Sequence, residues 1–348
     1  LLGRLRLACA PLLDVEVRAT TMATQGDLSL LRHVIEDGSL VAAQSGEWPS
    51  NREVRQAVSQ TLANLEAADL LGTQSVVTRH YGGAFYSFAQ AVELDALAVD
   101  ARASSQPAKL AALLSTASAA VNTVGKQFAQ PLRLTAKDGS LKRHLASKIL
   151  RERAMPVGAT YLSMMNRYAA LPRPIAHDNQ VIVGDYAKVL PNLKGRVSVV
   201  YADPPYTRDH YSRFYHVLET LSLGDDPEID TSNLSERLSR GFYRADRVQS
   251  DFCIKSKAPA AFERLIGGVA DLEVPLVLSY SAFDADKGGR PRLLSISDVR
   301  DLASKSYRSV RIERIADSGH NKLASIGLSK GSDTSAEVIF LCQDPIRR

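Results

Sequence analysis

Residues 197–206 read Val-Ser-Val-Val-Tyr-Ala-Asp-Pro-Pro-Tyr, and this stretch decides the fold. Its β-branched first half predicts a buried strand of the kind that a covered parallel sheet requires. Two successive prolines permit neither a helix nor further ladder pairing. Asp203-Pro204-Pro205-Tyr206 is therefore expected to form a stiff loop at the carboxyl end of the strand. In open α/β sheets this is the edge at which ligands bind.

The expected loop offers a carboxylate, a backbone carbonyl and an aromatic ring on one rigid support. This set suits a planar amine such as the exocyclic amine of adenine, whose lone pair is delocalised into the base. If Asp203 and the Pro204 carbonyl each accept one N–H, the lone pair turns toward a methyl donor, and Tyr206 can stack on the extruded base. A strand with an ordinary proline turn is the plainer reading, but the four residues together favour an amine methyltransferase.

The tetrapeptide Asp203-Pro204-Pro205-Tyr206 resembles the catalytic signature of adenine-specific DNA methyltransferases of the Dam type. The continuation 207–219 and the upstream segments 81–88 and 124–131 resemble a branch of the same family. The resemblance implies these four residues as the catalytic set, S-adenosyl-L-methionine as methyl donor, no metal, and double-stranded DNA as substrate. It also implies methylation at adenine N6, in a solitary enzyme or in a restriction-modification pair with a cognate restriction enzyme.

The fold implied is α/β, with a doubly wound Rossmann-like methyltransferase sheet and a smaller target-recognition insert. We expect a helical amino-terminal part of the catalytic domain over 1–123, a basic target-recognition insert over 124–175 and the catalytic α/β domain over 176–348. Residues 1–21 are expected to be a strand or an unstructured lead, and 180–184 a strand. Helices are expected over 51–71, 188–193, 210–221 and 297–305, with two more in 88–123, and strands over 274–281, 309–315 and 337–342.

Donor binding is the part of the resemblance that the sequence matches least. Asp185, followed by Tyr186, ends the expected strand before the catalytic one, and we expect both to contact the donor; an N-cap role for Asp185 is the alternative. The Phe-x-Gly-x-Gly type loop of the family does not occur in the chain. A fragment whose glycine loop lies upstream is the favoured explanation, ahead of a degenerate enzyme or of donor binding completed by another chain.

The chain of 348 residues has an ordinary apolar content of 45% and a modest net charge of +5. Basic residues cluster at 126–153 and 237–257, which are read either as solvated faces or as phosphate contacts beside a base-handling loop. The residues expected to bind DNA are Lys126, Arg133, Lys142, Arg143, Arg208 and Tyr211. No long apolar stretch, signal peptide or disulfide framework is recognised, so the expected location is cytoplasmic and no membrane partner is expected.

Two rival functions remain open at this point. An amine methyltransferase acting on RNA or on protein would use a related tetrapeptide, and the basic insert argues against protein. A catalytically inactive DNA-binding fragment or subunit would explain the missing glycine loop. Target sequence, oligomeric state and activity cannot be read from the sequence.

Overall fold

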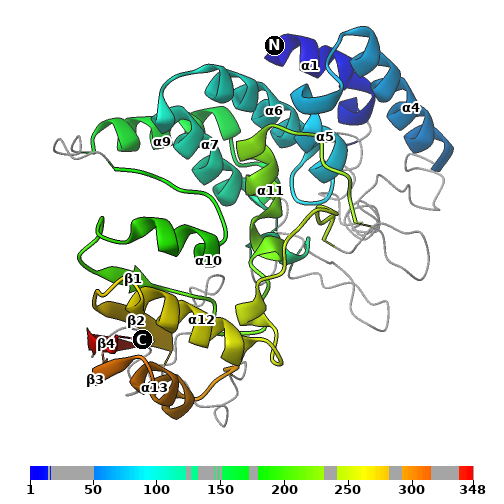
Figure 1. The fold of residues 1–348 in the computed structure, drawn as a ribbon. Coiled ribbons are helices and arrows are strands. Elements are labelled where there is room, and N and C mark those ends of the chain that lie inside the picture. The colour runs from blue at the N-terminus through cyan, green and yellow to red at the C-terminus, as the bar shows by residue number, and fades with distance from the viewer. Residues whose placement is uncertain are drawn as a thin grey trace. The chain divides into compact units, whose positions relative to one another are not determined.

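The computed structural model describes residues 1–14, 16, 51–122, 127–131, 145, 148, 151–171, 179–230, 241–281, 292–314 and 337–347. The chain forms two compact units (Figure 1). A helical unit comprises Leu1–Arg173 and Ser212–Arg247, and an α/β unit comprises Pro174–Tyr211 and Val248–Arg348. The mixed α/β composition expected from the sequence is confirmed.

The helical unit contains the longest helices that the sequence predicts. The two helices expected within 88–123 are confirmed: Ser87 begins α6 with a capping box to Gln90, and Pro107 begins α7 at a position where its missing N–H costs nothing. The helical elements of this unit are α1 (Leu2–Ala8), α4 (Asn51–Ala67), η1 (Gly72–Gln74), α5 (Val76–Tyr81), α6 (Phe88–Ala103), α7 (Pro107–Ala120), η2 (Gln127–Ala129), α9 (Val157–Ala169) and α11 (Ser212–Leu223).

The amino-terminal residues are helical, so the expectation of a strand or an unstructured lead over 1–21 is wrong for the described part. In α1, Leu5 and Ala8 are buried, and Cys9 follows them into the same small core. These side chains pack against Leu65 of α4 and Val92 of α6. Tertiary burial of one apolar face is what makes so short a helix stable.

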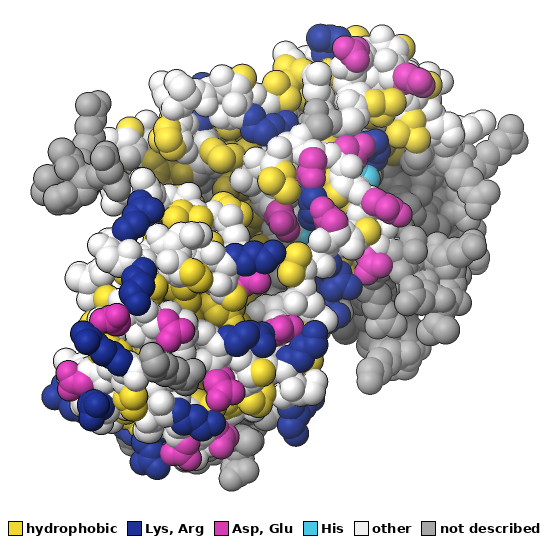
Figure 2. Space-filling view, in the orientation of Figure 1, with side chains coloured by type: hydrophobic (Ala, Val, Ile, Leu, Met, Phe, Trp, Pro, Cys, Tyr) yellow, Lys and Arg dark blue, Asp and Glu magenta, His cyan; other side chains and the backbone are white. Residues whose placement is uncertain are grey.

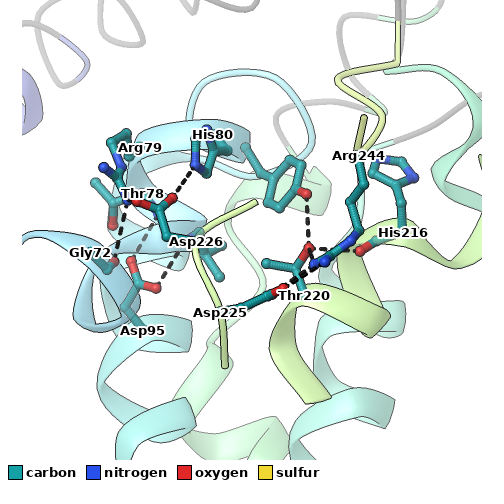
Figure 3. Close-up of polar contacts among 12 residues, drawn as sticks. Gly72, Thr78, Arg79, His80, Asp95, His216, Thr220, Asp225, Asp226 and Arg244 are labelled. Carbon is teal, nitrogen blue, oxygen red and sulfur yellow. Dashed lines mark hydrogen bonds and ion pairs between the residues drawn. The ribbon is translucent and has the colours of Figure 1, made fainter. Parts of the chain in front are cut away.

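The carboxyl-terminal part of the helical unit, 212–247, is tied to α5 by polar contacts (Figure 3). The buried Arg244 guanidinium forms ion pairs with Asp225 and Asp246 and donates to Thr220 Oγ1 at 3.2 Å. Thr220 Oγ1 in turn lies 3.2 Å from the Tyr81 hydroxyl of α5. These contacts explain why 212–247 packs with the helices, although the sequence analysis counted it with the α/β domain.

A buried carboxylate fixes the start of α5. Asp95, on α6, is 2% exposed and accepts hydrogen bonds from the backbone N–H groups of Val77 and Thr78 at 2.9 and 2.8 Å (Figure 3). Burial raises the pKa of Asp95 to about 7, while the hydrogen bonds from Thr78 and Val77 act in the opposite direction. Asp95 therefore satisfies two of the backbone donors that every helix start leaves without an intrahelical partner.

The α/β unit is built on a sheet of four described strands in the order β1-β2-β4-β3. β1 (Val200–Ala202) is parallel to β2 (Leu276–Ser281), whereas β4 (Glu337–Pro345) is antiparallel to both β2 and β3 (Tyr307–Arg314). The helical elements are α10 (Tyr186–Val189), η3 (Leu190–Leu193), η4 (Asp251–Cys253), α12 (Ala258–Ala270) and α13 (Ile296–Ser304). The predicted strands at 274–281, 309–315 and 337–342 and the helix at 297–305 are confirmed within a few residues.

One hydrophobic core holds the α/β unit together. β2 is buried along most of its length, and α12 and α13 pack against the sheet (Figure 1). The ring of Tyr280, on β2, contacts the ring of Phe262 of α12 at a centroid distance of 5.7 Å. It also contacts the ring of Phe340 of β4 at 6.4 Å. The sheet is thus anchored at β2, which positions its neighbour β1.

Two strand predictions in this unit are corrected. The strand expected over 197–202 is limited to 200–202, and it is half-exposed rather than buried: Val199 is 52% and Tyr201 64% exposed. Residues 180–184, also expected as a strand, have no regular structure, and Val181 and Val183 are 90% and 94% exposed. Residues 180–184 and 197–199 have no pairing strand among the described residues, and ladder pairing is what makes such a pattern a strand.

Cationic and anionic side chains are interspersed over the surface of the α/β unit shown in Figure 2. Ion pairs link Arg264 and Lys257 to Asp251, at 3.1 and 3.2 Å, and Lys305 to Glu263 at 3.4 Å. Of the described cations in the basic stretch 237–257, Arg244, Arg247 and Lys257 each form an ion pair with an aspartate. The exposed pairs among these contribute little to stability individually.

Two further findings concern the whole described part of the chain. No helix in it is long and apolar enough to cross a membrane. Cys9, Cys253 and Cys342 are free and buried. Burial raises the pKa of the Cys342 thiol to about 11.

Replacing Asp95 by alanine should destabilise the helical unit by about 1–3 kcal/mol, because two buried backbone donors lose their acceptor. Hydrogen exchange should accelerate at the amides of Val77 and Thr78. Asp100→Ala is the matched control: it lies on the same helix but is exposed and pairs with Lys109 at 2.9 Å, so its cost should be below about 1 kcal/mol. Equal unfolding free energies for the two variants would contradict the capping role.

Candidate active site

Three chain segments bring polar side chains to one edge of the sheet in the α/β unit. Because β1 and β2 are parallel, with Ala202 opposite Leu278, their carboxyl ends point to the same edge. Glu337, the first residue of β4, pairs with Ser281, the last residue of β2, at that edge. Asp203 directly follows β1, so it enters the same region, as the sequence analysis expected for the catalytic loop.

Burial and hydrogen bonds hold the loop that contains Asp203. Pro204 is buried, which removes this part of the loop from solvent. Thr207 Oγ1 lies 3.2 Å from the carboxylate of Asp209, and the Cys253 thiol donates to the Asp209 carbonyl at 3.1 Å. These contacts restrain the loop, and its stiffness stays a prediction.

Tyr206 contacts two side chains from later segments of the chain, Tyr280 of β2 and Arg292. Its ring centroid is 5.5 Å from that of Tyr280, with the planes at 66°, in the edge-to-face range that aromatic pairs prefer. The Arg292 guanidinium carbon lies 4.9 Å from the Tyr206 centroid, within cation–π distance. Tyr206 itself is half-buried, so its position is set by packing while part of its surface remains accessible.

The electrostatics of the edge are dominated by two carboxylates. Partial burial raises the pKa of Asp203, and the nearby Glu337 carboxylate raises it further because a second negative charge disfavours ionisation. Burial also raises the pKa of the Tyr206 hydroxyl, with Arg292 acting in the opposite direction. Asp203 is exposed, and a carboxylate can accept hydrogen bonds from a ligand.

The two residues expected to contact a methyl donor have other partners. The Asp185 carboxylate accepts a hydrogen bond from the Ala187 N–H at 3.0 Å and is the N-cap of α10, which is the alternative considered for it. The Tyr186 hydroxyl donates to the Ala261 carbonyl of α12 at 3.0 Å, and its ring packs against Phe252 at 5.5 Å. Donor contact by either residue stays a prediction.

The expected DNA-binding residues are only partly described. Arg208 and Tyr211 are exposed near the end of the first segment of the α/β unit, and DNA contact by either stays a prediction. The remaining four lie outside the described residues: Lys126, Arg133, Lys142 and Arg143.

His216, a residue of α11, belongs to the core of the helical unit. Its ring is fully buried among Tyr81, Phe85 and Tyr243, at centroid distances of 5.2–5.8 Å. Burial lowers its pKa to about 3, so it is neutral and serves packing rather than proton transfer. Among the described residues, no group of three or more histidine, cysteine or acidic side chains is placed to hold a metal ion.

Sequence reasoning missed two residues at the sheet edge, Glu337 and Arg292. Glu337 stands 134 positions after Asp203, and no local motif marks it; only the pairing of β2 with β4 brings it there. Arg292 follows 282–291, which lies outside the described residues. The polar end of the predicted strand 274–281 was the one usable signal, since strand ends at this edge bind ligands.

Residues 163–262 match the sequence model of a family described as D12 class N6 adenine-specific DNA methyltransferase. This region contains Asp203-Pro204-Pro205-Tyr206, so the resemblance recognised from the tetrapeptide is confirmed. No solved structure matches the chain with statistical significance.

Two curated relatives share part of the sequence. Modification methylase LlaI of Lactococcus lactis subsp. lactis is 32% identical over 107 residues, which cover 31% of this chain and 15% of the relative. Type II methyltransferase M.NlaIII of Neisseria lactamica is 28% identical over 151 residues, covering 41% of this chain and 39% of the relative. The chain thus spans well under half the length of both relatives.

The carboxyl of Asp203 should titrate above the ordinary range of an aspartate, and Glu337→Gln should lower its pKa, because removing the second negative charge favours ionisation. Carbon NMR of aspartate-labelled protein measures both values. Glu313→Gln, an exposed change on β3, is the matched control and should leave the Asp203 titration unchanged. A pKa unaltered by Glu337→Gln would show that the two carboxylates do not interact.

Proposed function

We propose that this chain methylates the N6 amine of adenine in double-stranded DNA, with S-adenosyl-L-methionine as the methyl donor. The observation that carries the proposal is the placement of Asp203 and Tyr206 on a rigid loop at the carboxyl edge of a parallel strand pair. The match of 163–262 to an adenine-specific methyltransferase family supports the same substrate class. The names of the two relatives support a role in restriction-modification.

In this proposal the loop prepares the amine for attack on an electrophilic methyl group. The Asp203 carboxylate and the Pro204 carbonyl each accept one amine N–H, which turns the nitrogen lone pair out of the plane of the base. Tyr206 stacks on the extruded adenine, and a base–aromatic contact of this kind contributes about 1–3 kcal/mol. That offsets part of the few kcal/mol needed to unstack the base.

The charge on Asp203 suits a reaction in which the amine becomes cationic. An ionised carboxylate both accepts the N–H hydrogen bond and stabilises the positive charge that develops on nitrogen. Because the pKa of Asp203 is raised, acidification protonates Asp203 at a higher pH than it protonates an ordinary aspartate. The proton leaves the methylated amine after transfer, so Asp203 need not act as a strong base.

The described residues fit the acceptor side of this reaction better than the donor side. S-adenosyl-L-methionine, when bound, supplies the electrophilic methyl group. Asp185 and Tyr186 lie on the segment expected to meet it, but the Asp185 carboxylate caps α10 and the Tyr186 hydroxyl binds a carbonyl of α12. To contact the donor, either residue has to share its polar group between the donor and its present partner, or to touch the donor with another part of its side chain.

We further propose that the four strands belong to a larger doubly wound sheet. Tyr201 of β1 and Val199, just before β1, have exposed apolar side chains. Side chains of this kind are normally covered by another layer or strand. Val181 and Val183 carry the same signal in the segment that precedes α10. The residue ranges 1–123, 124–175 and 176–348 keep their proposed roles as helical part, target-recognition insert and catalytic domain.

One observation favours a second candidate function, that of a DNA-binding subunit without donor affinity. The glycine loop of the family does not occur in the sequence, and the two expected donor residues have intramolecular partners. Titration calorimetry with S-adenosyl-L-methionine separates the candidates. Micromolar binding would argue against a subunit that lacks donor affinity.

Asp203→Ala and Asp203→Asn should each lower methyl transfer to unmethylated DNA at least about 100-fold, the scale of loss when one preorganised polar partner of a reacting group is removed. DNA affinity should change little, because phosphate contacts dominate it. Asp301→Asn is the matched control, since Asp301 is an exposed aspartate on α13. Parent-like transfer rates in the two Asp203 variants would refute the mechanism.

A further inference from the structure

Residues 292–294 form a short strap across the catalytic loop. Leu293 N–H donates to the Tyr206 carbonyl at 3.3 Å, and the hydroxyl of buried Tyr280 donates to the Leu294 carbonyl at 2.7 Å. The Arg292 guanidinium also donates to the hydroxyl of Ser281, which is 1% exposed. The strap is therefore fixed to the end of β2, and its backbone is fixed to Tyr206.

The Arg292 side chain covers one part of the Tyr206 ring. Its guanidinium carbon lies 4.9 Å from the ring centroid, and burial lowers the pKa of Arg292 while the two tyrosines raise it. A partly desolvated cation binds an aromatic face more strongly than an exposed one does. A planar guanidinium can donate in its plane to Ser281 while its face lies over the ring, which a lysine ammonium cannot do.

An aromatic ring that stacks on a flipped base has to be held in one orientation before the base arrives. Tyr280 restrains Tyr206 through an edge-to-face contact at 5.5 Å, and Arg292 restrains it through the cation–π contact. Tyr206 is only half-buried with both contacts made, so part of its surface remains accessible. Holding the ring in place in advance lowers the cost of ordering it when the base binds.

We propose that Arg292 is a positioning residue that holds Tyr206 in the orientation in which its ring receives the target base. The inference rests on the proposed function, since it assigns a partner to the ring that stacks on adenine. A direct contact between Arg292 and a DNA phosphate is the competing role, and it makes different predictions for the salt dependence of binding and for a double mutant.

The test compares Arg292→Met, Arg292→Lys, Tyr206→Ala and the double variant Arg292→Met with Tyr206→Ala in the full chain. Arg292→Met should raise the KM for DNA by about 2- to 30-fold, the range of a cation–π contact, with a smaller effect on kcat. The KM of Arg292→Lys for DNA should lie between the values of the parent and of Arg292→Met. In the Tyr206→Ala background, Arg292→Met should have no further effect, because the residue acts through the ring.

Arg300→Met is the matched control, since Arg300 is an exposed arginine of α13 in the same unit, and it should behave as the parent. Thermal unfolding checks that the variants are folded. Two results would assign Arg292 to phosphate contact and overturn the inference. One is that Arg292→Met raises the KM for DNA as much in the Tyr206→Ala background as in the parent, and the other is that Arg292→Met makes the salt dependence of DNA binding shallower.

A readout without activity separates this inference from the proposed function. In tyrosine-labelled protein without DNA, the Tyr206 ring resonances should broaden or shift in Arg292→Met and stay unchanged in Arg300→Met. Unaltered Tyr206 resonances in Arg292→Met would overturn the inference even if the parent methylates DNA. A response of Tyr206 in a parent that methylates no substrate would support the positioning of the ring and refute the proposed function alone.

Discussion

The parallel pairing of β1 with β2 is the interaction on which the site depends. It places Ala202 opposite Leu278, 76 positions later in the sequence, so the carboxyl ends of the two strands lie at one edge. β2 is buried and anchored by α12 and β4, so the short β1 takes its position from it. The two prolines then end β1 and leave Asp203 and Tyr206 on a stiff loop at that edge.

The sheet edge combines side chains with distinct tasks. Asp203 supplies an acceptor whose pKa is raised by burial and by Glu337, Tyr206 supplies a ring, and Arg292 and Tyr280 hold that ring. The register that places Ser281 opposite Glu337 brings that carboxylate to the same edge. Backbone pairing, rather than any local motif, therefore determines the environment of the tetrapeptide.

The sequence was informative where local rules decide the structure. The break between α6 and α7 follows from a capping box and a proline, and the loop after β1 follows from Pro204 and Pro205. It was misleading at 180–184 and 197–199, because an apolar β-branched run forms a strand only if another strand pairs with it. Glu337 and Arg292 could not be predicted, since their positions depend on pairing across long sequence separations.

The measurement that tests the central claim most directly is nucleoside mass spectrometry of unmethylated double-stranded DNA after incubation with the chain and labelled S-adenosyl-L-methionine. The account predicts label in N6-methyladenine alone, because the acceptor pair and ring at the β1 edge suit the amine of a flipped adenine. Label confined to RNA or protein, or no label in a preparation that binds both DNA and donor, would contradict it.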